Sequence, residues 1–408
     1  MRSALITGGS GFFGGILKRS LLERGWKVVN LDLVNDEDRH ENLLSIQGDI
    51  RDRKLLDDIF SKNWSDRVGL AGPARGGLHR GKGWSVEGKP LGCPFTHIFH
   101  CAAILAHAAK DKNFLWTSNV DGTRNVAEAA KAHGVKHLVF TSSNCLWGEN
   151  FHRPVREDDE PKPVEIYGKS KWEGEKILKE YERDMNIVIL RCPTIVDAGR
   201  LGLLSILFEF IDEGRKVWVV GGGKNVYQFI AAPDLVDACI KAADFNASAT
   251  FNIGSDNVKS FREVYESVIR KAGAKAQVAN LPRSLAIPAM KIAYALGLSP
   301  LGPYQYKMIA EDFVFDTSRI KEKLGWRPTI TNEDMLWRAY EYYRKHRAEI
   351  ESRIDASAHR SSAKMGVIRI LKWLSCPHPR RGAAILSKPP PALSSIASAS
   401  SFPLHRTS

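Results

Sequence analysis

Apolar and polar positions alternate along the first half of the chain in a pattern that predicts a parallel sheet. Short apolar runs recur at "SALIT", "KVVNLD", "LLSIQGD", "HIFHCAA", "HLVFTSS" and "NIVILR", and helical patterns separate them. Strands that alternate with helices are joined by right-handed crossovers, which place helices on both faces of the sheet. The first half of the chain is therefore predicted to be an α/β domain with a doubly wound parallel sheet.

After about residue 193 the pattern becomes shorter and mixed. Helical periodicity appears near residues 233–244, 259–272, 283–298 and 332–350. The change predicts a sheet domain over residues 1–192 and a smaller mixed lobe over residues 193–350. The third helical stretch, "LAIPAMKIAYALGL", fits the core of this lobe better than the wall of a pocket. Pro288 and Lys291 interrupt it, and no stretch reaches the roughly 18 apolar residues of a membrane-spanning helix.

Two segments do not follow these periodicities. Residues 66–93 are rich in Gly and Arg, which predicts a disordered insertion; a lid or a basic docking loop is the alternative. Residues 351–408 are rich in Ser, Ala, Pro and basic side chains, and they are predicted to be disordered. Within this tail, "MGVIRILKWLS" could lie on an anionic membrane surface, but docking on the body or no structure at all fits it better.

The net charge of +13 resides mainly in these two segments. Residues 356–408 contain eight Lys or Arg and no acid, and residues 66–93 contain five Lys or Arg and two acids, which leaves +2 elsewhere. A nearly neutral body argues against a specific nucleic-acid partner.

The cysteines and the N-terminus indicate a cytoplasmic protein. The six cysteines form no CxxC pair and no metal-ligand spacing, so we expect mostly buried thiols and no metal site. A strand-like run begins at residue 3, which leaves no room for a signal peptide. The cysteines are Cys93, Cys101, Cys145, Cys192, Cys239 and Cys376.

A glycine-rich turn follows the first predicted strand. In "ALITGGSGFFGG", Gly8, Gly11 and Gly14 are spaced three apart, at the point where a helix opens. Glycines there let the backbone approach a pyrophosphate, and the helix N-terminus favours its negative charge. The turn therefore predicts a dinucleotide site of the Rossmann type.

Asp32 strengthens this prediction and selects the dinucleotide. It ends the second predicted strand, where a carboxylate can accept hydrogen bonds from the adenosine ribose. Its charge would repel a 2′-phosphate, and the following "LVN" offers no arginine to neutralise one, so NAD is preferred over NADP. Asp49, in "QGDIRD", could reach the adenine edge or serve as a turn residue.

Tyr167 and Lys171 lie four residues apart in "EIYGKSKWEGEKILKEY", which is predicted to be a helix. This spacing places both side chains on one face, whereas Lys169 points away. A nearby ammonium and a positive nicotinamide ring would both lower the pKa of the tyrosine and favour the phenolate, which is the form that accepts a proton. Ser143, at the end of "HLVFTSS", can hydrogen-bond the same substrate oxygen.

The ordered motifs "TGGSGFFG", "GDI", "HCAA", "NVDGT", "TSSNCLWG", "YGKSK" and "LRCPTIV" resemble the extended short-chain dehydrogenase/reductase family, the NAD-dependent epimerase/dehydratase group. The resemblance covers about residues 1–350 apart from the insertion. It implies catalytic roles for Ser143, Tyr167 and Lys171, with Asn119 supporting the helix that carries the lysine. The candidate cofactor contacts are Gly8, Gly11, Phe12, Phe13, Gly14, Asp32, Asp49, Ile50, Ala102, Ala103, Tyr167, Lys171 and Pro193.

The branches of this family differ in the steps after hydride transfer. Dehydratases carry an Asp-Glu pair after the catalytic hydroxyl residue, but this chain has Asn144 and Cys145, which disfavours elimination. Sugar-nucleotide epimerases share the order of motifs and "LGWRPT", yet they usually bind the diphosphate with an arginine where this chain has Tyr227. Lys224 or another basic residue could substitute for it.

Three functions therefore remain open. The first is an NAD-dependent epimerase or dehydrogenase on a nucleotide sugar. The second is an oxidoreductase on a sterol-like alcohol, as in the 3β-hydroxysteroid dehydrogenase branch. The third, an NAD-binding regulator without turnover, is disfavoured by the intact Ser, Tyr and Lys. We expect a small-molecule partner, and a homodimer is compatible with the sequence.

Overall fold

The structure is a computed structural model, and it describes residues 2–61, 95–105, 111–148, 151–296, 298 and 308–352. The predicted insertion at 66–93 and almost all of the predicted tail at 351–408 lie outside the described residues. Within the described ranges, none of the helices has the length and apolar character needed to cross a membrane.

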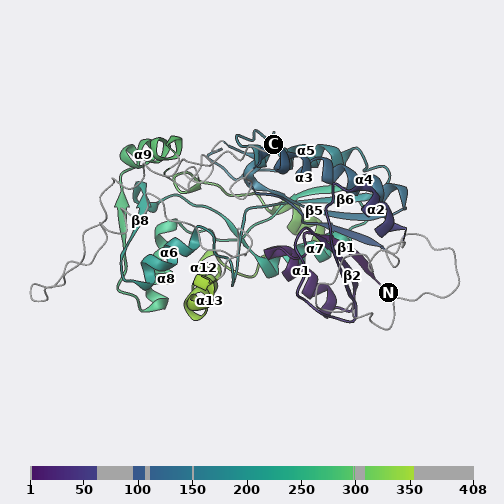
Figure 1. Cartoon of the computed structure of the whole chain (residues 1–408). Helices are drawn as coiled ribbons and strands as arrows, with labels where there is room; N and C mark the ends of the chain where they lie inside the picture. Colours follow the sequence, from purple (N-terminus) through teal and green to yellow (C-terminus); the bar gives the residue numbers. More distant parts are fainter. Residues whose placement is uncertain are drawn as a thin grey trace, which may run out of the picture.

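A seven-stranded parallel sheet forms one half of the molecule (Figure 1), in the order β10-β6-β5-β4-β1-β2-β3. Each of the six predicted apolar runs is a strand of this sheet, and several strand interiors are fully buried because helices cover both faces. The strands are β1 (Ser3–Thr7), β2 (Lys27–Asp32), β3 (Leu43–Gln47), β4 (His97–His100), β5 (His137–Ser143), β6 (Asn186–Cys192) and β10 (Ala249–Asn252).

Two layers of helices sandwich the sheet, as Figure 1 shows. One apolar cluster joins Leu17 and Leu21 to Val236 on one face, and a second joins Leu56 to Leu178 on the other. The doubly wound Rossmann architecture is therefore confirmed. The first layer contains α1 (Phe12–Glu23), α7 (Ala232–Ala243) and α11 (Ser318–Leu324); the second contains α2 (Arg53–Phe60), α3 (Lys112–Asn119), α4 (Asp121–Ala132) and α5 (Ile166–Lys179).

The second half of the molecule is a smaller mixed lobe around its own apolar core, which includes Phe208, Val268 and Leu336. Its helix α8 shows why these segments are helical: Ser260 and Glu263 form a capping box at its start. The elements are β7 (Thr194–Val196), α6 (Leu204–Asp212), β8 (Lys216–Val220), β9 (Phe229–Ala231), α8 (Phe261–Ala272), β11 (Gln277–Leu281), α9 (Arg283–Ala295), α12 (Asn332–Lys345) and α13 (Arg347–Ser352), with short 3₁₀ helices η2 (Asn144–Leu146) and η3 (Gly221–Gly223).

The predicted domain boundary at residue 193 does not separate the apolar core of the sheet domain from that of the second lobe. Helix α7 and strand β10 return to the sheet, and Trp326 is buried in the same apolar cluster as α1. A parallel strand can join a sheet only through a crossover, so the chain visits the second lobe and comes back. The sheet domain is therefore larger than residues 1–192.

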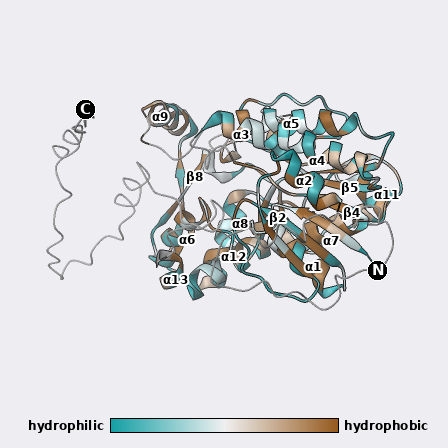
Figure 2. Cartoon of the chain, turned by 45° about the vertical axis from the view of Figure 1, so that its right-hand side comes forward, coloured by the Kyte–Doolittle hydropathy of each residue, from teal (hydrophilic) through white to brown (hydrophobic). Residues whose placement is uncertain are grey.

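Helix α9 does not fit the expectation of a core helix. Ala286 is its only buried residue, whereas Leu285, Ile292 and Leu296 are 67%, 61% and 66% exposed. The inner face packs through Met290 on a small cluster with Val220. Figure 2 shows the helix at the edge of the molecule, with much of its ribbon in the brown of hydrophobic residues.

Candidate active site

The candidate site lies where the strand order of the sheet reverses. Strand β1 pairs with β2 on one side and with β4 on the other. The connections after β1 and β4 leave in opposite directions there and open a crevice at the carboxyl ends of the strands. Dinucleotides bind in this kind of crevice in doubly wound sheets.

The glycine-rich turn crosses this crevice at close range. Gly8 has a φ of +79°, and a Cβ added to it would lie 2.7 Å from the backbone nitrogen of Ala102 in the loop after β4. A Cβ on Gly14 would overlap the Gly8 carbonyl oxygen. Gly11 serves as the N-cap of α1, with no side chain to cap the helix. Helix α1 therefore begins at the crevice, where the positive end of its dipole favours the negative charge of a pyrophosphate.

The two phenylalanines after Gly11 are buried. Phe13 is 7% exposed and belongs to the same apolar core as Leu17, so its side chain holds α1 against the sheet. Phe12 is 5% exposed, and its ring edge lies 3.9 Å from the position of a Cβ on Gly199. The loop after β7 therefore packs against the glycine-rich turn.

Asp32 is fixed at the end of β2 by backbone groups. Its two carboxylate oxygens accept hydrogen bonds from the N–H groups of Ser10, at 2.8 Å, and Val34, at 3.0 Å. Asn30 accepts a bond from the Gly9 N–H at 3.0 Å. These bonds tie the glycine-rich turn to the end of the strand, beside the crevice.

Asp49 is engaged by a neighbouring arginine. Its carboxylate accepts hydrogen bonds from the Arg51 guanidinium at 2.6 and 2.9 Å and from the Arg51 backbone N–H at 2.8 Å. Burial alone would raise the pKa of Asp49, but these bonds hold it below its ordinary value. Ile50 is 8% exposed and faces Gly122 of α4, where an added Cβ would lie 2.6 Å from its side chain. The contacts of Asp49 are therefore those of a residue that stabilises a turn, and its contact with the adenine of the cofactor remains a prediction.

Asn119 ties the loop after β4 to the helix that carries Lys171. Its side-chain oxygen accepts a bond from the Ile104 N–H at 2.7 Å, and its amide donates to the Ile104 carbonyl at 3.0 Å. The same amide donates to the Ser170 hydroxyl at 3.0 Å. The loop thus held contains Ala102 and Ala103, so Asn119 links the predicted cofactor contacts to α5.

Ser143 and Tyr167 come together at the carboxyl end of β5, and Lys171 follows Tyr167 one turn later in α5. Ser143 ends the strand, and its hydroxyl accepts a bond from the Cys145 N–H at 3.1 Å. Tyr167 lies in the first turn of α5, and burial raises its pKa above the ordinary value. A hydrogen bond with Ser143 and the positive charge of Arg200 oppose this rise.

Lys171 is almost completely buried, at 2% exposed. Its ammonium lies 3.9 Å from the centre of the Phe140 ring, a cation–π contact. Burial lowers the pKa of Lys171 to about 8, although Glu175 is among the groups that act in the opposite direction. The lysine therefore remains mostly protonated at neutral pH.

His100 is a buried residue at the site that the sequence did not single out. One ring nitrogen lies 2.6 Å from the Thr7 hydroxyl and the other 2.9 Å from the Thr123 hydroxyl. Burial and the charge of Lys171 lower the pKa of His100 to about 3, so the ring is neutral. His100 thus links β1, β4 and α4 beneath the crevice. His100 ends the apolar run "HIFH", and no motif or residue spacing in the sequence distinguishes it from an ordinary core residue.

Pro193 directly follows β6, beside the buried Cys192. Cys192 donates a weak bond to the Ser142 carbonyl at 3.0 Å, which keeps the ends of β5 and β6 together. Burial raises the pKa of Cys101 and Cys192 to about 12. These thiols, like Cys239, are free, as predicted, and Cys93 and Cys376 lie outside the described residues.

The sequence model of the "NAD dependent epimerase/dehydratase family" matches residues 4–81 and 92–254, more than half of the chain. The chain belongs to this family. It is an enzyme of the extended short-chain dehydrogenase/reductase class, as the motifs predicted, and the family is NAD-dependent. No group of residues within the described ranges has the composition of a metal site.

Curated relatives of this epimerase/dehydratase chain span two kinds of substrate. It is 33% identical over 91% of its length to the uncharacterized protein y4nG of Sinorhizobium fredii, covering 86% of that protein. It is 28% identical over 83% of its length to a UDP-glucose 4-epimerase of Mycolicibacterium smegmatis, covering 98% of it. It is 24% identical over 69% of its length to a 3beta-hydroxysteroid-dehydrogenase/decarboxylase of Arabidopsis thaliana, covering 70% of that protein.

Solved structures share the fold. The UDP-glucose 4-epimerase of Thermotoga maritima, crystallised with UDP-glucose, matches 84% of this chain and 99% of its own, with a TM-score of 0.64 and 22% identity. WbmG of Bordetella bronchiseptica, crystallised with NAD, matches 89% of this chain and 97% of its own, with a TM-score of 0.63 and 20% identity.

Asn144 and Tyr227, at which this chain departs from the dehydratase and epimerase motifs, contact each other. The Asn144 amide donates to the Tyr227 hydroxyl at 2.6 Å. Tyr227 is 3% exposed and stacks on Phe261 with ring centres 6.1 Å apart. Gln228 bonds the Ser255 carbonyl at 2.8 Å, so it serves the fold. Tyr227 therefore links the apolar core of the second lobe to Asn144, the residue after Ser143.

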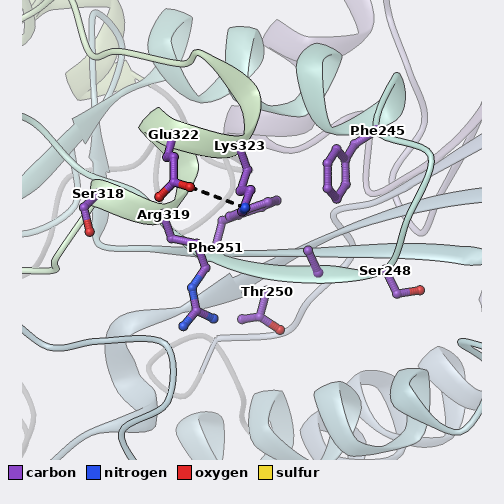
Figure 3. Close-up of a pocket in the computed structure, with 9 residues that line it drawn as sticks. Phe245, Ser248, Thr250, Phe251, Ser318, Arg319, Glu322 and Lys323 are labelled. Carbon is purple, nitrogen blue, oxygen red and sulfur yellow. Dashed lines mark ion pairs between the residues drawn. The ribbon is translucent and has the colours of Figure 1, made fainter.

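A hollow of about 590 Å³ lies elsewhere, at the free edge of the sheet (Figure 3). Phe245 and Phe251 face it from the sheet domain, and Glu322 and Lys323 of α11 form an ion pair at 3.4 Å over it. Strand β10 is the edge strand beside this hollow, and strands β6, β5 and β4 lie between it and the crevice next to β1. The hollow is therefore separate from the candidate active site.

Proposed function

We propose that this chain is an NAD-dependent epimerase that acts on a nucleotide sugar through Ser143, Tyr167 and Lys171. The observation that carries the proposal is the meeting of Ser143 and Tyr167 beside the crevice of the glycine-rich turn. The curated UDP-glucose 4-epimerase that matches 83% of the chain supports the same substrate class.

The residues at the crevice fit NAD. A side chain at Gly8 or Gly14 would fill the space in which the backbone approaches a pyrophosphate. Asp32 presents a carboxylate at the end of β2 for the ribose hydroxyls. Arg39, the first basic residue after Asp32, donates to the carbonyls of Asp36 and Asp38 at 2.7 and 2.9 Å, so it already has partners. This set favours NAD over NADP.

The proton chemistry belongs to Tyr167. When bound, NAD supplies the acceptor for a hydride from the carbon that bears the substrate hydroxyl. Tyr167 takes the hydroxyl proton, and Ser143 donates a hydrogen bond to the same oxygen and holds it in place. Burial raises the pKa of Tyr167, so the phenolate forms only when positive charge is added beside it. Lys171 and the bound cofactor are the sources of that charge.

Lys171 has a second task at the same site. Its buried ammonium can donate hydrogen bonds to the ribose hydroxyls, which orients the cofactor relative to Tyr167. Asn119 supports this placement, because it bonds Ser170, the residue before the lysine. Asn144 and Cys145 offer no carboxylates for elimination, so the oxidised substrate is expected to be reduced again rather than dehydrated.

Arg200 is our candidate for the cation that the epimerase motif places at position 227. It belongs to the loop that packs against Phe12, and its charge acts on Tyr167. A guanidinium at this place can bind a diphosphate through bidentate hydrogen bonds. Arg200→Met should therefore weaken binding of UDP itself; if Lys224, exposed after η3, supplies the charge instead, Lys224→Met will weaken it and Arg200→Met will not.

A second candidate is an oxidoreductase on a flat apolar alcohol. The aromatic cluster of Tyr227, Phe229 and Phe261, which reaches Asn144 through Tyr227, favours it, and the Arabidopsis relative belongs to that class by its name. The third candidate, a regulator without turnover, is not supported, because the chain belongs to a family of enzymes.

One experiment distinguishes these candidates. The protein is incubated with substoichiometric NAD and either UDP-sugars or 3β-hydroxysterols, and products are followed by NMR while NADH is followed by absorbance. An epimerase converts many equivalents of sugar without net NADH, because the hydride returns. Stoichiometric NADH with sterol alone would support the oxidoreductase and contradict the epimerase.

A further inference from the structure

A buried ion pair joins the catalytic helix to the strand beside it. Glu175 of α5 and Arg191 of β6 have side chains that are 0% and 2% exposed. Arg191 donates from Nη2 to one carboxylate oxygen at 2.7 Å and from Nε to the other at 3.0 Å. This is the bidentate geometry in which pairs between arginine and a carboxylate are strongest and most directional.

The pair also reaches two other segments at the site. The Ser142 hydroxyl donates to the Glu175 carboxylate at 2.5 Å, and Ser142 immediately precedes Ser143. Arg191 donates from Nη1 to the Glu157 carbonyl at 2.8 Å, in the segment that leads into α5. The end of β5, the end of β6, α5 and its preceding segment therefore meet at one charged centre.

Aromatic rings shield this centre. The Arg191 guanidinium lies 5.1 Å from the ring centre of Trp147 and 6.0 Å from that of Trp172. Trp147 follows η2, and Trp172 follows Lys171 in α5. In such surroundings the attraction between charges is weakly screened, so the positions of the bonded groups are tightly coupled.

Glu175 is one helical turn beyond Lys171, on the same face of α5. Its charge raises the pKa of Lys171 against the lowering effect of burial. The other titratable groups that interact with the lysine are His100 and the thiols of Cys101 and Cys192. Burial keeps all three neutral at pH 7, so Glu175 supplies the negative charge that acts on the ammonium.

We propose that Glu175 and Arg191 form a positioning pair, which holds the ends of β5 and β6 against α5 and keeps a negative charge one turn from Lys171. Neither residue touches substrate or cofactor in this role. Glu175 acts through Lys171 and through Ser142, and Arg191 acts through Glu175 and the Glu157 carbonyl. The inference rests on the proposed function for its consequences in turnover, but the effect on Lys171 exists in the free protein.

The stability of the fold does not by itself require a buried ion pair at this position. Apolar residues of similar volume often replace a buried ion pair with no loss of stability, whereas removing one partner leaves an uncompensated charge. The double variant Glu175→Leu with Arg191→Met therefore separates positioning from folding. A pair that only stabilised the fold would leave the site unchanged when it is replaced in this way.

The first measurement uses the free protein. The pH dependence of Lys171 acylation by a small anhydride, read by mass spectrometry, gives the pKa of the ammonium without cofactor or substrate. The midpoint in the double variant should move down, because Glu175 raises the pKa of Lys171. Ser142→Ala, which keeps both charges, should leave the midpoint in place.

The second measurement is turnover in the conditions where the wild type is active. The double variant should keep its melting temperature within a few degrees and lose about thirtyfold or more in kcat, with a pH profile displaced in the same direction as the acylation midpoint. An unchanged Lys171 midpoint with unchanged turnover in a folded double variant overturns the proposal. If the double variant does not fold, Glu175→Gln, which keeps shape and hydrogen bonding but not charge, carries both readouts. A wild type without turnover refutes the proposed function alone, because the acylation result stands by itself.

Discussion

Replacing Gly8 by alanine tests the close approach between the glycine-rich turn and the loop after β4. The added Cβ would lie 2.7 Å from the Ala102 nitrogen and 2.8 Å from its Cα, where ordinary contacts begin at 3.4 Å. Gly8 also has a φ of +79°, a conformation that costs an L-residue about 1–2 kcal/mol. Gly25→Ala is a matched control, because Gly25 has a φ of +75° but no atom within 4 Å of its added Cβ.

The two variants therefore share the backbone strain and differ in the overlap. Gly25→Ala should lower the free energy of unfolding by about 1–2 kcal/mol and leave NAD affinity unchanged. Gly8→Ala should lose a further 1–3 kcal/mol or so, because the loop must move to accommodate the methyl group, as in an overpacked core. Movement at the crevice should also weaken NAD binding about tenfold or more, equivalent to about 1.4 kcal/mol.

Urea unfolding followed by circular dichroism measures the first effect, and calorimetric titration with NAD measures the second. Equal losses of stability in the two variants, with equal NAD affinity, would refute the reasoning. That result would mean that the loop after β4 is not held at the distance seen here, or that the dinucleotide does not bind across it.

Three further predictions concern charge at the site. NAD should bind at least about tenfold more tightly than NADP, and Asp32→Ala should narrow the difference; equal affinity of the wild type for both cofactors would contradict the role of Asp32. NAD affinity should fall as the pH rises through about 8, where Lys171 loses its proton, and Lys171→Met should bind NAD weakly without this pH dependence. The folded pKa of His100, about 3, is below the unfolded value near 6.5, so the unfolded chain takes up the proton first and stability falls as the pH drops below about 6.5. Between pH 6.5 and 5 this loss is about 1.6 kcal/mol, and urea titrations of His100→Gln should show it reduced; parallel pH dependence in both proteins would contradict it.

The sheet and the crevice could be predicted because their signals are local. Buried parallel strands read as continuous apolar runs, and the turn at Gly8, Gly11 and Gly14 requires residues without side chains. The spacing of Tyr167 and Lys171 follows from helical periodicity alone. Each of these features is set by residues close together in the sequence.

Features that depend on contacts between distant segments were not visible in the sequence. The bond between Asn144 and Tyr227 joins residues 83 positions apart, and that between Glu175 and Arg191 joins residues 16 apart on different elements. The return of β10 to the sheet was hidden because a four-residue strand has too short a pattern to assign. The exposed side of α9 was hidden for another reason: an apolar helix looks the same in sequence whether or not another element covers it.

The central claim, that Tyr167 is the proton acceptor of an active enzyme, is tested most directly by Tyr167→Phe. The change removes one hydroxyl from a site where the ring is held by α5, so the fold and NAD binding should persist while turnover falls about a hundredfold or more. Lys169→Met, on the exposed side of the same helix, is the control and should retain activity. Turnover near the wild-type level in Tyr167→Phe would contradict the account.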